Sequence, residues 1–306
     1  MTYVFGPVPS RRLGLSLGID LVPAKTCSYD CLYCQVGRTT SSTLEPGEFC
    51  RVSDVIAELG HKLERVTPDV ITLSGSGEPT LHARIDQIID LIKEMTDRRI
   101  ALLTNGSLLW REDVRERVSG AHVIMPTLSS VFEETFQTIH RPHPDLRLQT
   151  VIGGIKELRK SYRGQLYLEV IFLAGINDSE KEVAGLRQAI REISPDRVQL
   201  NTVVRPPADE KALSLDRKRL EDIKSFFGEV AEIIVGSPST QKAVRGAPSA
   251  DLILDMAKRR PVRVQDVASA LNEPVQEVED LMKGLLIKGA LSKHEHGGDI
   301  YYMCRS

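Results

Sequence analysis

The sequence lacks the features that would direct it to a membrane or to secretion. No apolar run approaches the roughly 18 residues that a transmembrane helix needs. Residues 1–12 contain no apolar core of the kind found in a secretory signal, and no repeat or low-complexity tract is present. We therefore expect a cytoplasmic protein with no membrane partner.

An excess of charge of either sign is also missing. The chain has 40 Lys and Arg against 42 Asp and Glu, a net charge of -2. Binding of nucleic acid or of a membrane over the whole surface would need a strongly basic balance. The length of 306 residues allows one large domain or a domain with a smaller partner.

Cysteine is scarce and odd in number, with residues Cys27, Cys31, Cys34, Cys50 and Cys304. An odd count in a chain expected to be cytoplasmic argues against a disulfide framework. Cys27, Cys31 and Cys34 form a C-x3-C-x2-C cluster just after the first predicted strand. This clustering indicates a metal site.

Two kinds of metal site suit three neighbouring thiolates. Structural zinc takes four closed ligands, so zinc would need a distant His or Cys50 as its fourth. An ordinary [4Fe–4S] cluster takes four cysteines, one for each iron. With three cysteines one iron stays open to nitrogen and oxygen atoms of a substrate or cofactor, and we favour this site over zinc.

Strands and helices are expected to alternate from residue 16 to about residue 204. Short runs rich in Val, Ile and Leu predict buried parallel strands at 16–22, 70–74, 100–104, 122–127, 166–173 and 197–203. Amphipathic stretches predict helices at about 53–65, 84–95, 111–118, 147–160 and 179–192, the first with Ser53 as its N-cap. Six such units predict an α/β fold, a partial (βα)6 TIM-like barrel, although a doubly wound sheet would show the same alternation.

The end of the chain has a different pattern. A helix at about 216–227 and a strand at 232–235 precede three helices, at 249–258, at about 264–271 and from Pro274. A hairpin with strands at 290–293 and 300–303 follows. This order is winged-helix-like, so we divide the chain into a barrel domain, 1–248, and a winged-helix-like C-terminal domain, 249–306.

The C-terminal segment is not basic, because residues 249–306 contain eight Lys and Arg against nine Asp and Glu. Phosphate contacts to a duplex need a basic surface. Duplex DNA is therefore not expected as a partner, and a protein-contact or lid role is favoured.

A glycine-containing turn follows the second predicted strand, at Ser74-Gly75-Ser76-Gly77-Glu78-Pro79-Thr80. Gly75 and Gly77 allow the backbone to approach a ligand closely, and Glu78 can accept from a ligand ammonium group. Taken alone, such a turn at a strand end is a weak signal.

Further polar residues fall at predicted strand ends or within strands. Asn105, in Thr104-Asn105-Gly106, is either a turn residue or a ligand contact. Glu169 lies in an apolar strand, where a carboxylate must be paired or face the barrel lumen. Asn201 and Arg205 end the sixth strand, and Arg205 either binds a carboxylate or phosphate or forms a solvated ion pair.

Three remaining candidates have plain alternatives. His140 and Arg141 begin a polar segment, 140–144, that we predict to be a surface loop, with substrate contact as the alternative. Cys304 would serve the reaction as a thiol if it reached the barrel mouth. A small buried residue is the alternative for Cys304.

The cysteine motif, with Tyr33 before its last cysteine, resembles the signature of the radical S-adenosylmethionine (SAM) superfamily over roughly residues 5–205. The resemblance implies that Cys27, Cys31 and Cys34 ligate a [4Fe–4S] cluster. The amino and carboxylate groups of SAM would then chelate the fourth iron. It also implies that Tyr33 packs near the adenine.

The turn at 74–80 is similar to the element that binds the SAM amino group, which more commonly has adjacent glycines. The resemblance therefore assigns Gly75, Gly77 and Glu78 to SAM binding. It places Asn105 near the SAM methionine or ribose, and Glu169 against SAM or substrate.

In function, the resemblance implies reductive cleavage of SAM to a 5′-deoxyadenosyl radical that abstracts hydrogen from a substrate. It also implies a reductant protein such as flavodoxin or ferredoxin. With residues 6–14 and 140–144, the sequence resembles a subgroup of uncharacterised Fe–S oxidoreductases related to the wyosine-forming tRNA-modifying enzymes. That relation points to a tRNA or nucleoside substrate.

Two alternatives remain open. One is a radical SAM enzyme acting on a peptide, a protein or a small metabolite. The other, from a different class, is an Fe–S sensor with a winged-helix output. The element at 74–80 and the acidic third helix of the C-terminal segment count against the sensor.

Overall fold

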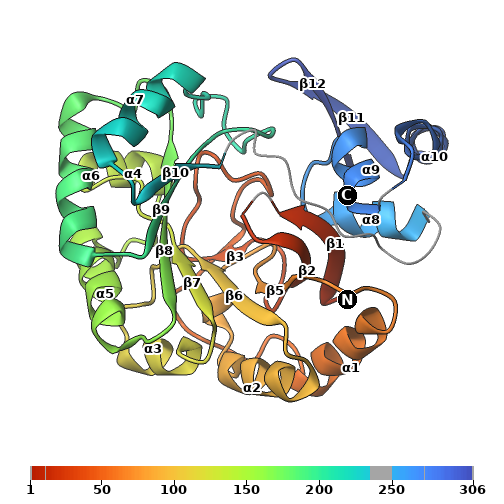
Figure 1. The fold of residues 1–306 in the computed structure, drawn as a ribbon, viewed down its shortest axis with the longest axis horizontal. Helices are drawn as coiled ribbons and strands as arrows, with labels where there is room; N and C mark the ends of the chain where they lie inside the picture. Colours follow the sequence, from red (N-terminus) through yellow and green to blue (C-terminus); the bar gives the residue numbers. More distant parts are fainter. Residues whose placement is uncertain (1, 11, 235–249, 272, 305–306) are drawn as a thin grey trace.

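The computed structural model describes residues 2–10, 12–234, 250–271 and 273–304. Its main feature is an eight-stranded sheet with the order β1-β2-β5-β6-β7-β8-β9-β10 (Figure 1). The strands are β1 Val4–Ser10, β2 Gly14–Ile19, β5 Val70–Leu73, β6 Arg99–Thr104, β7 Val123–Pro126, β8 Gln165–Phe172, β9 Arg197–Thr202 and β10 Ala231–Ile233. All neighbouring pairs are parallel except the antiparallel pair of β1 and β2.

The order of the strands decides between the two predicted sheet types. Strands β2 and β5 to β9 are the six predicted strands, and each lies beside the next one along the chain. A doubly wound sheet reverses its order at a switch point, and this sheet has no reversal. The sheet curves in one direction with its helices outside, as in a partial TIM barrel (Figure 1).

The helices around the sheet bury apolar faces. They are α1 Val52–Leu63, α2 Ile85–Met95, α3 Glu112–Val118, α4 Glu133–His140, α5 Leu148–Ser161, α6 Glu180–Ile193 and α7 Arg217–Phe227. In α2 the buried residues Ile85, Ile88, Ile89 and Ile92 follow the helical period. Within the described ranges, no helix has the length and apolarity that crossing a membrane would require.

The C-terminal unit contains the expected three helices and hairpin. They are α8 Ala250–Arg259, α9 Val264–Leu271, α10 Val275–Ile287, β11 Leu291–His296 and β12 Asp299–Cys304. The strands are longer than predicted, because the turn is only Gly297-Gly298, both with positive φ. The predicted domain boundary at 248 and the predicted strand end at Val235 lie outside the described residues.

The core of this unit includes residues from the other end of the chain. Phe5 and Val8 of β1 pack in one apolar cluster with residues such as Ile253, Met256 and Met282. In Figure 1 the helices α8 and α9 lie beside β1. Strand β1 therefore belongs to the barrel sheet and to the core of the C-terminal unit.

Three local features differ from the sequence prediction. Strand β1 was not predicted, and neither was α4. The N-cap of α1 is Arg51, without a side-chain cap bond, so Ser53 lies inside the first turn. The Ser53 hydroxyl instead contacts Asp54 Oδ1 at 3.3 Å.

Candidate active site

One cavity of about 390 Å³ opens where β5, β6 and β9 end. It brings together most of the residues singled out from the sequence, namely Cys27, Cys31, Tyr33, Cys34, Gly75, Gly77, Glu78, Asn105, Glu169, Asn201 and Arg205. Apolar side chains such as Leu103, Met125 and Ile171 complete its wall. His140, Arg141 and Cys304 are not among the lining residues.

The loop that carries Cys27, Cys31 and Cys34, called the cysteine loop below, is closed by two very short strands. Strands β3, Thr26–Cys27, and β4, Ser41–Ser42, pair in parallel, and the Lys25 carbonyl accepts from the amides of Thr40 and Ser41. Burial raises the pKa of the Cys27 thiol to about 12 and raises that of Cys31 well above its ordinary value. Binding of iron would therefore have to displace protons from these thiols.

Glu78 is fixed by hydrogen bonds from its neighbours. Its Oε1 accepts from the amide and hydroxyl of Thr80, at 3.1 and 2.6 Å, and from the Thr104 hydroxyl, at 2.6 Å. Its Oε2 accepts from the Asn105 amide at 2.8 Å. Three donors crowd Oε1 and fill its acceptor capacity, whereas Oε2 accepts one bond and retains acceptor capacity.

Asn105 connects this carboxylate to the cysteine loop. Its Nδ2 donates to Ser28 Oγ at 2.8 Å and lies 3.5 Å from Cys27 Sγ. Gly77 also packs against the cysteine loop, because a Cβ at this position would lie 2.2 Å from the Thr26 carbonyl oxygen. The turn at 74–80 and the cysteine loop therefore form one packed unit.

His140 was predicted to lie in a surface loop, and this prediction is wrong. It is the last residue of α4 and is 1% exposed. Its Nδ1 lies 3.4 Å from both Cys31 Sγ and Tyr33 Oη. Burial lowers the pKa of His140 to about 3, so the imidazole is neutral at pH 7. Its contacts support the cysteine loop from behind the cavity wall.

Arg141 also serves the cysteine loop. It ends α4 at φ 41° and pairs with Asp209 at 2.7 Å. Arg38, from the cysteine loop, pairs with Asp209 at 2.8 Å and with Asp30 at 3.0 Å. These four charged residues tie the cysteine loop to the end of α4 and to the segment after β9.

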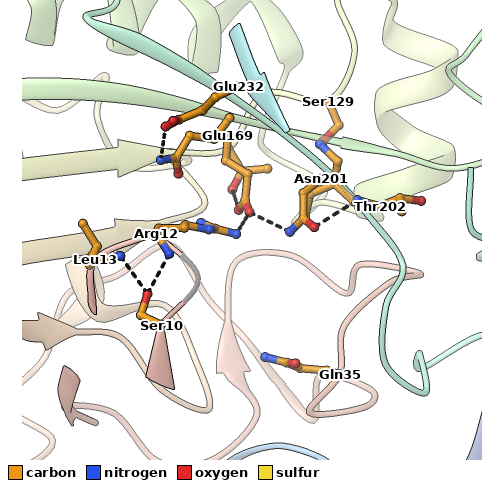
Figure 2. A network of polar contacts seen from close by, with 12 residues as sticks. Ser10, Arg12, Leu13, Gln35, Ser129, Glu169, Asn201, Thr202 and Glu232 are labelled. Carbon is orange, nitrogen blue, oxygen red and sulfur yellow. Dashed lines mark hydrogen bonds and ion pairs between the residues drawn. The ribbon is translucent and has the colours of Figure 1, made fainter. Parts of the chain in front are cut away.

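Glu169 points into the cavity and is paired there with Arg12 (Figure 2). Asn201 Nδ2 donates to Glu169 Oε1 at 3.2 Å, and the Thr127 hydroxyl donates to Oε2 at 3.2 Å. Sequence reasoning noted Arg12 only as part of a motif. An arginine among turn residues gives no sign of a partner in a strand more than 150 residues away.

Asp20 is another buried carboxylate near the cavity, and it was not singled out from the sequence. It is 1% exposed, accepts from the Ser76 amide at 3.2 Å and lies 3.4 Å from Arg259. Burial raises its pKa above the ordinary value. Its position inside a predicted apolar strand was the available signal.

The two other cysteines lie elsewhere. Cys304 Sγ lies 3.5 Å from the Leu254 carbonyl oxygen and packs against the C-terminal core, away from the cavity. Cys50 Sγ lies 3.3 Å from His82 Nε2 and does not line the cavity.

Comparison with known proteins identifies the class to which this fold and site belong. A sequence profile described as the Radical SAM superfamily matches residues 21–186. The chain therefore belongs to the radical SAM superfamily: it is an enzyme whose cofactors are a [4Fe–4S] cluster and SAM. Within that class it is one of the UPF0026 proteins, being 33% identical to a UPF0026 protein of Methanocaldococcus jannaschii over 99% of this chain and 96% of that protein.

Other relatives differ in length or are more distant. A Brachyspira hyodysenteriae protein named GTPase Obg is 35% identical over 98% of this chain, which spans only 45% of that protein's length. A Methanothermobacter marburgensis protein named probable GTP 3',8-cyclase is 25% identical over 74% of this chain and 77% of that protein.

Solved structures share the fold. A radical SAM methyltransferase from Sphaerobacter thermophilus aligns with a TM-score of 0.55 and 16% identity, over 74% of this chain and 69% of that chain. TYW1 with a lysine-pyruvate adduct aligns with a TM-score of 0.52 and 13% identity, over 71% of this chain and 74% of that chain. At these identities the likeness shows the fold alone.

Proposed function

We propose that this enzyme holds its cluster with Cys27, Cys31 and Cys34 and acts on a nucleoside, a nucleotide or a tRNA. The observation that carries the cluster assignment is that these three thiols, from one loop, line one cavity with Tyr33 and Glu78. When bound, the cluster and SAM supply a 5′-deoxyadenosyl radical that abstracts hydrogen from the substrate.

The residues around the cavity fit these cofactors. The thiols are the soft donors that an iron–sulfur cluster needs. Glu78 Oε2 accepts one bond and can accept a second from the SAM ammonium group. Gly77 keeps the turn against the cysteine loop, since a side chain would meet the Thr26 carbonyl. Leu103, Met125 and Ile171 keep part of the wall apolar, which favours exclusion of water from the reacting atoms.

The cluster assignment is tested by iron content after anaerobic reconstitution. Cys27→Ala, Cys31→Ala and Cys34→Ala should each lower bound iron and change the EPR spectrum of the reduced protein. Cys50→Ala and Cys304→Ala are matched controls and should retain wild-type iron. Equal iron in all five variants would overturn the assignment.

The nucleoside or nucleotide substrate rests on the resemblance to wyosine-forming enzymes and on relatives named GTP 3',8-cyclase. Its test is substrate-stimulated formation of 5′-deoxyadenosine, with nucleotides, tRNA, peptides and small metabolites supplied separately. Stimulation by a nucleotide or tRNA supports the proposal. Stimulation only by a peptide or a small metabolite would overturn it.

We also propose that the C-terminal unit is winged-helix-like and works as a wall or lid of the active site. Arg259 and Arg260, at the end of α8, line the cavity. Helix α10 is acidic, and its Lys283 is paired with Glu279 at 2.9 Å and lies 3.8 Å from Asp280. Arg260→Met, at the cavity wall, should therefore impair substrate-dependent turnover, and tight, salt-sensitive binding of duplex DNA by the full chain would contradict the proposal.

A further inference from the structure

Arg205 is a nearly buried cation in the wall of the cavity, with 12% of its side chain exposed. Its Nε donates to the Pro261 carbonyl at 3.1 Å, and its Nη1 donates to Gln35 Oε1 at 3.4 Å. Both of these acceptors are neutral. Its Nη2 lies 4.0 Å from Asp266 Oδ2, which is at the limit of an ion pair.

Asp266 has a nearer partner than Arg205. Arg263 donates from Nη2 to Oδ1 at 3.0 Å, and from Nε and its backbone amide to Oδ2 at 3.3 Å each. The shorter contacts of this carboxylate are therefore to Arg263, which is also paired with Asp299 at 2.8 Å. Burial lowers the pKa of Arg205, and the nearby Asp266 carboxylate opposes this shift.

The cavity as a whole also has more cations than carboxylates in its wall. Its charged lining residues are Arg12, Arg205, Arg259 and Arg260 against Glu78 and Glu169. Glu169 is already paired with Arg12, and Arg259 lies 3.4 Å from the buried Asp20. Arg205, three residues after β9, contacts the backbone of Pro261, the residue that directly follows Arg260, and both arginines line the same cavity.

We propose that Arg205 binds an oxyanion of the substrate, a phosphate or carboxylate group, in the part of the cavity closed by Arg259 and Arg260. This inference rests on the proposed function, because it assigns a chemical class to the substrate of the same cavity. A guanidinium group matches the two oxygens of such an anion with parallel N–H donors. The C-terminal unit then completes the substrate site by supplying Pro261, which orients Arg205, and the cationic side chain of Arg260 in the cavity wall.

The SAM carboxylate is the other oxyanion that Arg205 could serve, and the experiment separates the two. Inorganic phosphate and acetate are titrated by calorimetry into the full-length reconstituted protein, with and without saturating SAM. The variants are Arg205→Met, Arg205→Lys and Arg260→Met. The control is Arg217→Met, which alters an ion pair with Glu221 on the surface of α7.

We expect wild type and Arg217→Met to bind at least one of the two anions equally, whether or not SAM is present. Arg205→Met should weaken that binding at least tenfold and Arg260→Met about threefold, with the SAM dissociation constant changed less than twofold. Arg205→Lys should retain part of the affinity. Should Arg205→Met not fold, the result is decided by Arg205→Lys and Arg260→Met, and wild-type affinity in both would overturn the proposal.

Three other results would overturn it. In the first, both anions compete with SAM and Arg205→Met loses affinity for SAM. In the second, wild type binds the anions but no cavity variant changes that binding, and in the third, wild type binds neither anion. Failure of the proposed function would appear separately, as wild-type protein that forms no 5′-deoxyadenosine, and the anion titration does not depend on that reaction.

Discussion

Arg12 and Glu169 form an ion pair across the cavity, which joins the turn between β1 and β2 to strand β8. In the sheet, β5, β6 and β7 lie between β2 and β8. Each side chain is 13% exposed. Glu169 keeps hydrogen bonds from Thr127 and Asn201 if Arg12 is lost. Glu169 is the carboxylate that pairs with Arg12, so loss of Glu169 leaves this nearly buried cation without that countercharge.

This asymmetry predicts unequal costs for the two substitutions. Glu169→Gln should lower the free energy of unfolding by about 3 kcal/mol, and Arg12→Met by about 1 kcal/mol. The double variant should be more stable than Glu169→Gln alone, because it removes the uncompensated cation. Urea unfolding of all four proteins measures this coupling, and additive effects would show that the pair contributes nothing.

Gly77 is predicted to be intolerant of a side chain. In Gly77→Ala the new Cβ would lie 2.2 Å from the Thr26 carbonyl and 2.6 Å from Val22 Cγ2, so the cysteine loop must shift. We expect lower iron content and at least tenfold weaker SAM binding. Gly153→Ala in α5 is the control: its Cβ meets nothing within 4 Å, and it should raise stability by about 0.5 kcal/mol. Normal iron and SAM binding in Gly77→Ala would contradict the assigned packing.

Asp209 is predicted to protect the cluster by holding two arginines. It pairs with Arg38 at 2.8 Å and with Arg141 at 2.7 Å, and its amide donates to the Leu32 carbonyl at 3.1 Å. Asp209→Asn should shorten the lifetime of the cluster in the presence of an iron chelator severalfold, because the cysteine loop loses its charged anchor. Absorbance of the cluster follows the loss. Glu221→Gln, which alters a surface pair on α7, should leave the lifetime unchanged.

His82 should make the protein less stable in mild acid. It is fully buried, and its Nδ1 accepts from the Arg84 amide at 3.2 Å, so protonation of that nitrogen would break the bond. Burial lowers the pKa of His82 below its ordinary value of 6.5. The unfolded chain therefore binds the proton first as the pH falls, and stability falls with pH below about 6.5.

The measurement is the urea midpoint between about pH 7.5 and pH 5.5. His82→Gln should lose less stability over this interval than wild type. The exposed His61→Gln should follow the wild-type slope. Parallel curves for wild type and His82→Gln would refute the assignment.

The sequence predicted the barrel because short runs rich in Val, Ile and Leu alternate with amphipathic stretches. The doubly wound alternative could not be dismissed from periodicity, since strand order is a tertiary property. Strand β1 was missed because its sequence, VFGPVPS, contains a glycine and two prolines, which usually interrupt strands. It pairs at the edge of the sheet, where prolines are tolerated.

The site residues that could be predicted are those at the ends of strands, because parallel strands bring their carboxyl ends to one edge of the sheet. Thus Glu78, Asn105 and Arg205, far apart in the chain, line one cavity. His140 was misplaced because α4 was not recognised, and a histidine before Arg-Pro looks like part of a loop. The partners Arg12 and Asp20 depend on contacts between distant segments, which one sequence does not reveal.

The most direct test of the account is the formation of 5′-deoxyadenosine by anaerobically reconstituted protein given SAM and dithionite. Wild type and Cys50→Ala should form it, and Cys31→Ala should not. This outcome would show that the cysteine loop carries the radical chemistry, leaving the substrate to be identified. Wild-type protein with a full cluster and bound SAM that forms no more 5′-deoxyadenosine than Cys31→Ala, with or without candidate substrates, would contradict the account.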